Sequence, residues 1–182
     1  MIYAVAGLLG SIVLAGLVHI LTILAVPHLA DDTIWDDLQQ ELADTTALVL
    51  PRPTPNSSAL GTVDPAMVMA ACRFDLGAGP LLVSAPTNAP QWMLTVHAPG
   101  GGVIYGVTSE TELLGGLEIE IRTEAQERGL IISDAPDQRV RIRSDWSEGF
   151  VLFRMLAAHP DERAGLERLA QRVRCRNLPD RL

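Results

Sequence analysis

The chain has 182 residues and a formal net charge of -8, and all 14 of its basic residues are arginines. This length provides for one folded domain beyond any membrane segment. The negative charge excludes a general nucleic-acid-binding surface, because neutralising phosphates requires clustered basic side chains. The charge is also uneven: every charged residue from Asp31 to Asp44 is acidic, whereas from Arg139 onward ten arginines stand against six acids.

Residues 1–26 form an apolar segment without Asp, Glu, Lys or Arg. A helix of this length can cross the roughly 30 Å hydrocarbon layer of a bilayer. A secretory signal peptide has a basic start, a shorter apolar centre and small residues before its cleavage point. This segment has no basic start, and Ile23 or His28 stands three residues before its best cleavage points. We therefore predict a transmembrane helix over 1–26 that stays attached and holds the chain in the lipid bilayer.

Two features of this segment suggest further roles. Gly7, Ser11 and Ala15 recur every fourth residue, which predicts a helix–helix contact along a strip of small side chains. The alternative is that small residues are simply common in membrane helices. His19 is the one ionisable side chain between residues 4 and 26, and intramembrane ionisable groups are functional candidates. A single imidazole without an acidic companion makes a poor proton path.

Residues 27–66 predict a juxtamembrane helix followed by a Pro-rich linker. Pro27 ends or kinks the first helix, and "DDTIWDDLQQELA" then places Ile34, Trp35, Leu38 and Leu42 at helical spacing. The sequence leaves open whether this helix lies at the membrane or packs on the folded domain. "PRPTPNSSALGTVDP" cannot sustain a helix or a central strand, so it is either a tether or an extended strip across the domain.

Residues 67–182 predict a β-rich domain. Its short apolar or alternating runs are bounded by Gly, Pro and Asp: "MAACRF", "LLVSA", "WMLTVHA", "VIYGV", "LEIEIR", "LIIS", "VRIR" and "FVLFRML". This rhythm is typical of an antiparallel β-sandwich or a partly closed barrel. "PDERAGLERLAQRVRC" predicts a C-terminal amphipathic helix with Leu166, Leu169 and Val173 as its buried stripe. The strand order stays open.

Residues that carry chemistry are sparse. His19, His28, His97 and His159 are isolated and offer no paired metal-ligand spacing, and no serine lies in a nucleophile elbow. "APGGGVIYG" predicts a hairpin turn, since a strand-like run follows it instead of the helix that a phosphate site needs. We therefore assign no catalytic residue, metal or cofactor. The alternative is a pocket near His97 and Tyr105, with Cys72 beside them.

Two pairings of residues distant in the sequence also stay open. Cys72 and Cys175 are the only cysteines, and they form either one long-range disulfide or two buried thiols. Alternation along "RVRIR" puts Arg139, Arg141 and Arg143 on one strand face, which predicts an anion-binding face. In the competing interpretation these arginines pair across the sheet with the glutamates of "LEIEIR", Glu118 and Glu120.

At "ACRFDLGAGPLLVSAP", "WMLTVHAPGGGVIYGV", "LEIEIRT" and "GFVLFRML" the chain resembles a bacterial family of membrane-anchored envelope proteins that carry the domain of unknown function 1254. The likeness covers the anchor and most of the region from Cys72 to Cys175. It implies an envelope location and a largely β domain. Larger relatives combine this domain with a second domain of unknown function. The matching motifs are structural, so the resemblance transfers no catalytic residue.

These observations together predict a single-pass protein of the bacterial inner membrane with its C-terminal domain in the periplasm. The domain is expected to be a binding or assembly module that contacts an envelope protein or a second copy of the chain, and not a nucleic acid. The alternative is an envelope enzyme or small-ligand-binding protein that uses the pocket near His97 and Tyr105. An oxidising periplasm would suit the disulfide.

Overall fold

The computed structural model describes residues 2–29, 38, 42, 46–52, 64–111, 116–128 and 139–179, with side chains described only to Val26 in the first range. The predicted run "LIIS" and the side chains of His28, Ile34 and Trp35 lie outside the described residues. The chain divides into two compact units, Met1–Thr33 and Ile34–Leu182.

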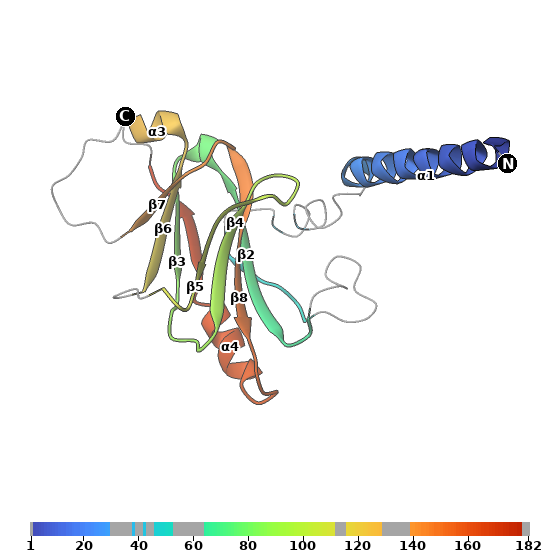
Figure 1. Ribbon diagram of the computed structural model, residues 1–182. Coiled ribbons are helices and arrows are strands. Elements are labelled where there is room, and N and C mark those ends of the chain that lie inside the picture. The colour runs from blue at the N-terminus through green and yellow to red at the C-terminus, as the bar shows by residue number, and fades with distance from the viewer. Residues whose placement is uncertain are drawn as a thin grey trace. The chain divides into compact units, whose positions relative to one another are not determined.

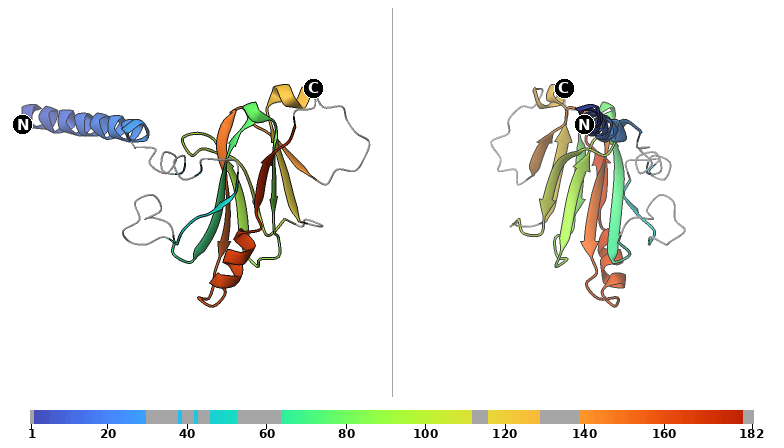
Figure 2. Two further views of the ribbon diagram at one scale, coloured as in Figure 1. Left: turned by 180° about the vertical axis from the view of Figure 1, so that it is seen from behind. Right: turned by 45° about the vertical axis from the view of Figure 1, so that its right-hand side comes forward.

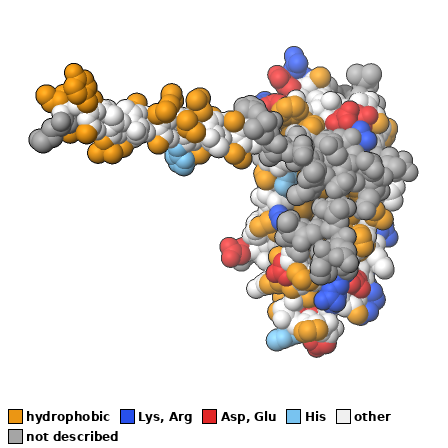
Figure 3. Space-filling view, turned by 90° about the vertical axis from the view of Figure 1, so that its right-hand side faces the viewer, with side chains coloured by type: hydrophobic (Ala, Val, Ile, Leu, Met, Phe, Trp, Pro, Cys, Tyr) orange, Lys and Arg blue, Asp and Glu red, His pale blue; other side chains and the backbone are white. Residues whose placement is uncertain are grey.

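The first unit contains one long helix, α1 (Ile2–Leu29). Its part Ile2–Val26 is long and apolar enough to cross a membrane. Figure 3 shows apolar side chains along the surface of this helix. The helix continues past Pro27 to Leu29. A proline removes one backbone donor, and here the loss falls in the last turn, where it interrupts little of the helix.

The second unit consists of two packed β-sheets (Figures 1 and 2). In the described residues, sheet A has the strand order β1 (Leu48–Val49), β2 (Met67–Asp75), β8 (Glu148–Leu156), β4 (Trp92–His97) and β5 (Val103–Thr108). Sheet B has the order β7 (Val140–Arg143), β6 (Leu117–Arg122), β3 (Leu81–Ala85) and β9 (Arg174–Asn177). The predicted β-sandwich is confirmed, and the two sheets do not close into a barrel. Three short helices complete the described fold: η1 (Leu76–Ala78), α3 (Glu124–Arg128) and α4 (Arg163–Ala170).

The main core lies between the sheets, where alternate residues of each strand point inward. β6 shows the pattern clearly, because Ile119 and Ile121 are fully buried while Glu118 points away from the core. Leu166 and Val173, from α4 and the turn after it, are buried in the same cluster. α4 thus supplies the predicted apolar stripe, with Leu169 partly buried beside it.

The C-terminal helix is shorter than the sequence predicted. α4 ends at Ala170, and the following "RCRN" forms β9, an antiparallel neighbour of β3. The prediction continued the helix to Cys175 because Leu166, Leu169 and Val173 recur at helical spacing. Pairing with β3 decides the structure instead, since Cys175 faces the core and its two arginine neighbours are exposed.

One strand pair departs from the antiparallel pattern. β6 and β7 run parallel, with Glu120 opposite Arg141 and Arg122 opposite Arg143. A parallel pair needs a crossover, and residues 123–139 provide the connection. The hairpin predicted at "APGGGVIYG" is confirmed: β4 and β5 pair antiparallel across it, and Gly100 and Gly101 take φ values of 80° and 85° that favour glycine.

A second apolar cluster covers the other face of sheet A. Leu38, Leu42 and Leu50 pack there against residues of β2 and β8, which are Met69, Ala71 and Phe150. The Leu42 amide donates to the Leu38 carbonyl over 2.8 Å, as in one helical turn. The sequence left open whether this helix lies at the membrane or packs on the folded domain. Leu38 and Leu42 pack on the domain. The same cover explains why β2 and β8 are apolar on both faces.

Candidate functional site

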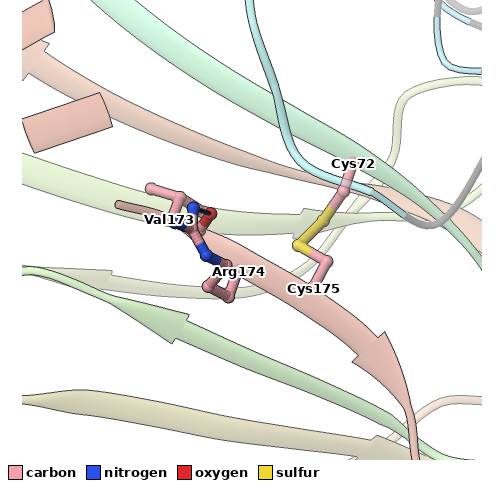
Figure 4. Close-up of a disulfide and its surroundings, with 4 residues drawn as sticks. All are labelled: Cys72, Val173, Arg174 and Cys175. Atoms are coloured by element: carbon pink, nitrogen blue, oxygen red, sulfur yellow. Dashed lines mark hydrogen bonds between the residues drawn. A yellow bond between two sulfur atoms is a disulfide. The ribbon is translucent and has the colours of Figure 1, made fainter. Parts of the chain in front are cut away.

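The two cysteines join the two sheets. Cys72 on β2 and Cys175 on β9 form a disulfide with a Cα–Cα distance of 6.5 Å and a sequence separation of 103 residues (Figure 4). The sequence left open a disulfide or two thiols, and the structure contains the disulfide. Because Cys72 is bonded and buried in the main core, it is not available as a nucleophile.

His97 ends β4 on the face of sheet A that points away from the main core. Its ring stacks on Phe150, with centroids 4.5 Å apart and planes 1° from parallel. Its Nδ1 lies 3.0 Å from the Gly101 carbonyl and its Nε2 lies 2.8 Å from the Thr95 hydroxyl. A carbonyl can only accept, so the neutral ring carries its proton on Nδ1 and accepts from Thr95 at Nε2.

The surroundings of His97 favour the neutral ring. Burial lowers the pKa of His97 below its ordinary value of 6.5, the hydrogen bond to Gly101 partly raises it, and the positive charge of Arg154 lowers it again. Both ring nitrogens are already engaged with the protein. The arrangement is that of a histidine held in place by its own β-hairpin.

The structure does not bring His97, Tyr105 and Cys72 together. Tyr105 lies opposite Val96 in the sheet, and both pack toward the main core. His97 follows Val96 in the chain and stacks on Phe150, which belongs to the second cluster on the opposite face. The alternative prediction, a single pocket lined by these residues, is therefore wrong, because consecutive side chains of a strand point to opposite faces of the sheet.

The outer face of sheet B, which points away from the core, gathers arginines from three strands. We call it the arginine face, and its members are Arg122, Arg139, Arg141, Arg143, Arg174 and Arg176. The register aligns them in rows: Leu82 on β3 lies opposite both Glu120 and Arg176, and Glu120 lies opposite Arg141. The predicted strand face of Arg139, Arg141 and Arg143 is thus one half of a wider surface.

Two glutamates lie among these arginines. The Arg139 Nε donates to Glu118 over 3.0 Å, which is the cross-strand pairing that competed with anion binding in the sequence. Glu120 is only 2 % exposed, and its carboxylate contacts the guanidinium of Arg122 on the same strand face. The second Glu120 oxygen lies 4.0 Å from Arg139 Nη1. Arg139 therefore spans both carboxylates.

Half of the arginine face escaped the sequence analysis. Arg174 lies in the predicted C-terminal helix and Arg176 lies just beyond its end, so the sequence did not predict that both align with β3. Arg122 ends a predicted strand, and its contact with Glu120 follows from their spacing of two residues on one strand. The alternation "RCRN" was the available signal, since a period of two is the mark of a strand.

One face of α1 forms a shallow open groove. Its lining consists of Ser11, Leu14, Ala15, Val18, His19 and Thr22. The Ser11 hydroxyl donates to the Gly7 carbonyl over 2.8 Å, so its polarity is satisfied within the helix. The predicted contact residues Gly7, Ser11 and Ala15 share this side of the helix, and His19 extends it by one further turn. Within the described ranges, no three His, Cys, Asp or Glu side chains gather closely enough to hold a metal ion.

Comparisons with known proteins relate the chain to a family and to a fold. The family model described as "Protein of unknown function (DUF1254)" matches residues 45–177. The VPA0106 protein of Vibrio parahaemolyticus is similar in structure, with 14 % identity and a TM-score of 0.57 over 81 % of this chain. An uncharacterized protein of Burkholderia cenocepacia aligns at 11 % identity and a TM-score of 0.48 over 79 % of this chain.

The chain spans only about a third of these solved proteins, 35 % of the first and 37 % of the second. At such low identity, the likeness to the Vibrio protein supports the fold alone. A search of curated proteins gave no match.

Proposed function

The chain belongs to the DUF1254 family, whose function is unknown, and we propose that this member is a single-pass inner-membrane protein whose β domain works in the periplasm as a binding or assembly module. α1 is the anchor in this proposal. The β domain presents its surfaces to a partner in the cell envelope or to a second copy of the chain.

The observation that carries the location is the disulfide between the sheets. Disulfides persist in oxidising compartments such as the periplasm and are rare in the cytosol. Cys72 and Cys175 are bonded in a chain whose α1 segment is apolar over 25 residues. A chain that is both anchored and oxidised is best accommodated by the inner membrane, with the β domain on the periplasmic side.

The assembly role is supported by the groove on α1. Small residues at positions 7, 11 and 15 let a second helix approach closely, and the His19 ring in the groove can hydrogen-bond across a helix pair. The proposed contact is therefore between α1 helices, either of two copies or of this chain and another anchored protein.

Helix association can be tested with two matched substitutions in the full-length chain. Gly7 and Gly16 both have open space around a Cβ, but Gly16 lies on the opposite side of the helix. We expect Gly7→Leu to reduce energy transfer between donor- and acceptor-labelled chains in proteoliposomes, and Gly16→Leu to leave it unchanged. Equal effects of the two variants, or a wild-type chain that is monomeric and recovered without a partner, would contradict the assembly role.

The alternative role as an enzyme or small-ligand receptor was tied to a pocket near His97 and Tyr105, and these two residues lie on opposite faces of sheet A. The binding or assembly module is thus the proposal to test first.

A further inference from the structure

We propose that the arginine face of sheet B docks on the anionic phospholipid headgroups of the membrane that holds α1. The inference rests on the proposed anchoring, and it assigns the arginine face a partner of defined chemistry. The docked domain would lie against the bilayer, with its guanidinium groups on lipid phosphates.

The charge of the face is opposite to that of the whole molecule. The chain carries a formal net charge of -8, yet among the residues that the structure describes the outer face of sheet B holds six arginines against two glutamates. Four of the arginines are exposed: Arg141, Arg143, Arg174 and Arg176. Of the glutamates, Glu120 is 2 % exposed and contacts Arg122, and Glu118 is engaged with Arg139. The surface offered to a partner is therefore strongly positive.

The exposed arginines lie along the two edges of a sheet and do not converge on one point. Arg141 and Arg143 are on β7 and Arg174 and Arg176 are on β9, with β6 and β3 between them. At about 4.8 Å per strand, the two pairs are separated by roughly 14 Å. Positive charge spread over this distance is matched better by an array of headgroup phosphates than by one small anion. Arg174 contributes its charge while its Nη1 donates to the Gln171 and Val173 carbonyls.

An exposed tryptophan adjoins the face. Trp146 is 52 % exposed in the turn that follows β7, and its amide and carbonyl are both hydrogen-bonded to the Ser144 hydroxyl. This turn follows Arg143 directly in the chain. Indole rings are favoured at the headgroup level of bilayers, so a tryptophan here is what a surface that meets lipid would carry.

Tethering through α1 favours lipid over a separate acidic protein as the partner of the arginine face. A domain tethered to α1 always has headgroups within reach, at an effective concentration that a separate protein does not match. Each arginine near an anionic surface contributes about 1 kcal/mol, or about fivefold in the docking equilibrium. Weak individual contacts therefore suffice when the partner is held in place by the chain itself.

The test uses the full-length chain in nanodiscs whose lipids carry bromine on the acyl chains. Bromine quenches tryptophan, and the signal of Trp146 is the difference between the chain and its Trp146→Phe variant. We expect stronger quenching of Trp146 with a mixture of phosphatidylglycerol and phosphatidylcholine than with phosphatidylcholine alone. The excess should disappear in about 1 M salt, where the Debye length is about 3 Å.

Charge variants assign the effect to this face. Arg143→Gln with Arg176→Gln should weaken docking roughly 25-fold, from two arginines at about fivefold each. Arg168→Gln with Arg172→Gln removes the same charge from exposed positions at α4 and the turn after it and should change nothing. If the first pair misfolds, Arg143→Gln with Arg174→Gln takes its place.

The outcomes separate the docking from the anchoring. Quenching that is equal in neutral and anionic discs, or equal in the two double variants, overturns the docking while the anchor stands. A chain that is not retained in the discs overturns both. Capture of an acidic protein by a photo-crosslinker at Arg176 in cells, without any dependence of quenching on anionic lipid, assigns the face to that protein and also overturns the inference.

Discussion

Glu120 is a buried carboxylate on the outer side of a sheet, a position where exposed side chains are the rule. It is tolerated because Arg122 contacts it directly and Arg139 lies 4.0 Å from it. The sequence predicted its strand and its face, since "LEIEIR" alternates with a period of two. It could not predict the approach of Arg139, which lies next to β7 and reaches Glu120 only because β7 pairs with β6.

Replacing Glu120 by glutamine should destabilise the β domain. The change leaves Arg122, whose side chain is 15 % exposed, without its charged partner, and breaking such a pair costs roughly 3 kcal/mol. Glu118→Gln is the matched control, because that carboxylate is half exposed and its pair with Arg139 contributes at most about 1 kcal/mol. Urea unfolding of the detergent-solubilised chain measures both variants. A loss for Glu118→Gln as large as that for Glu120→Gln would refute the role of burial.

The environment of His97 predicts a pH dependence of stability. Its pKa in the folded protein lies below the value of 6.5 that it recovers on unfolding, chiefly because of burial. As the pH falls below 6.5, the unfolded chain therefore binds a proton before the folded chain does. The contribution of His97 to the free energy of unfolding is therefore fully present above that pH and declines below it.

Urea midpoints between neutral pH and pH values below 6.5 measure this contribution. We expect His97→Gln to flatten the decline, and His159→Gln, at an exposed position, to leave the slope as in the wild type. An identical slope in the His97 variant would show that other groups cause the decline.

At the scale of elements, strands that alternate could be predicted and elements defined by their neighbours could not. β3 and β6 have the predicted bounds, because their inward residues are apolar and their flanks carry glycine or proline. The sequence of β9 is equally compatible with the end of a helix, and only its pairing with β3 makes it a strand. The parallel pairing of β7 with β6 is a contact between distant segments, which local pattern does not encode.

The segment after α1 behaves as part of the domain at its packed positions. Leu42 is 2 % exposed in the second cluster, so Leu42→Ala should lower the free energy of unfolding by about 2–4 kcal/mol. Leu48→Ala truncates an exposed leucine of β1 and should cost well under about 1 kcal/mol. Urea unfolding compares the two. If Leu42→Ala proves as mild as the control, this part of the chain is a free tether and not a cover for sheet A.

The disulfide ties β2 in one sheet to β9 in the other across 103 residues of sequence. Closing so long a loop restricts the unfolded chain, and the loop-entropy relation gives about 4–5 kcal/mol of stabilisation. We expect the double variant Cys72→Ala with Cys175→Ala to lose an amount of this order in urea unfolding. A reductant should destabilise the wild type similarly and leave the double variant unaffected. An unchanged midpoint after reduction would refute the disulfide's contribution.

At the scale of the whole molecule, the sequence predicted an anchor, a linker and a β domain, but not how the charge is distributed over the folded surface. The members of the arginine face come from separate parts of the chain, and only the order β7-β6-β3-β9 brings them to one face. Similarly, residues 38 and 42 meet sheet A because β2 and β8 expose apolar side chains there. Both features are products of strand order, which no local pattern in this chain specifies.

The central claim is that α1 is not cleaved and anchors a disulfide-bonded β domain on the periplasmic side of the inner membrane. The direct measurement is a gel shift with maleimide-polyethylene glycol on acid-trapped cells, scored in the membrane pellet after alkaline carbonate extraction. The account predicts a full-length chain in the pellet that takes up the reagent only after reduction, and then at both Cys72 and Cys175. A chain that reacts at both cysteines without reductant, or one found shortened in the supernatant, would contradict it.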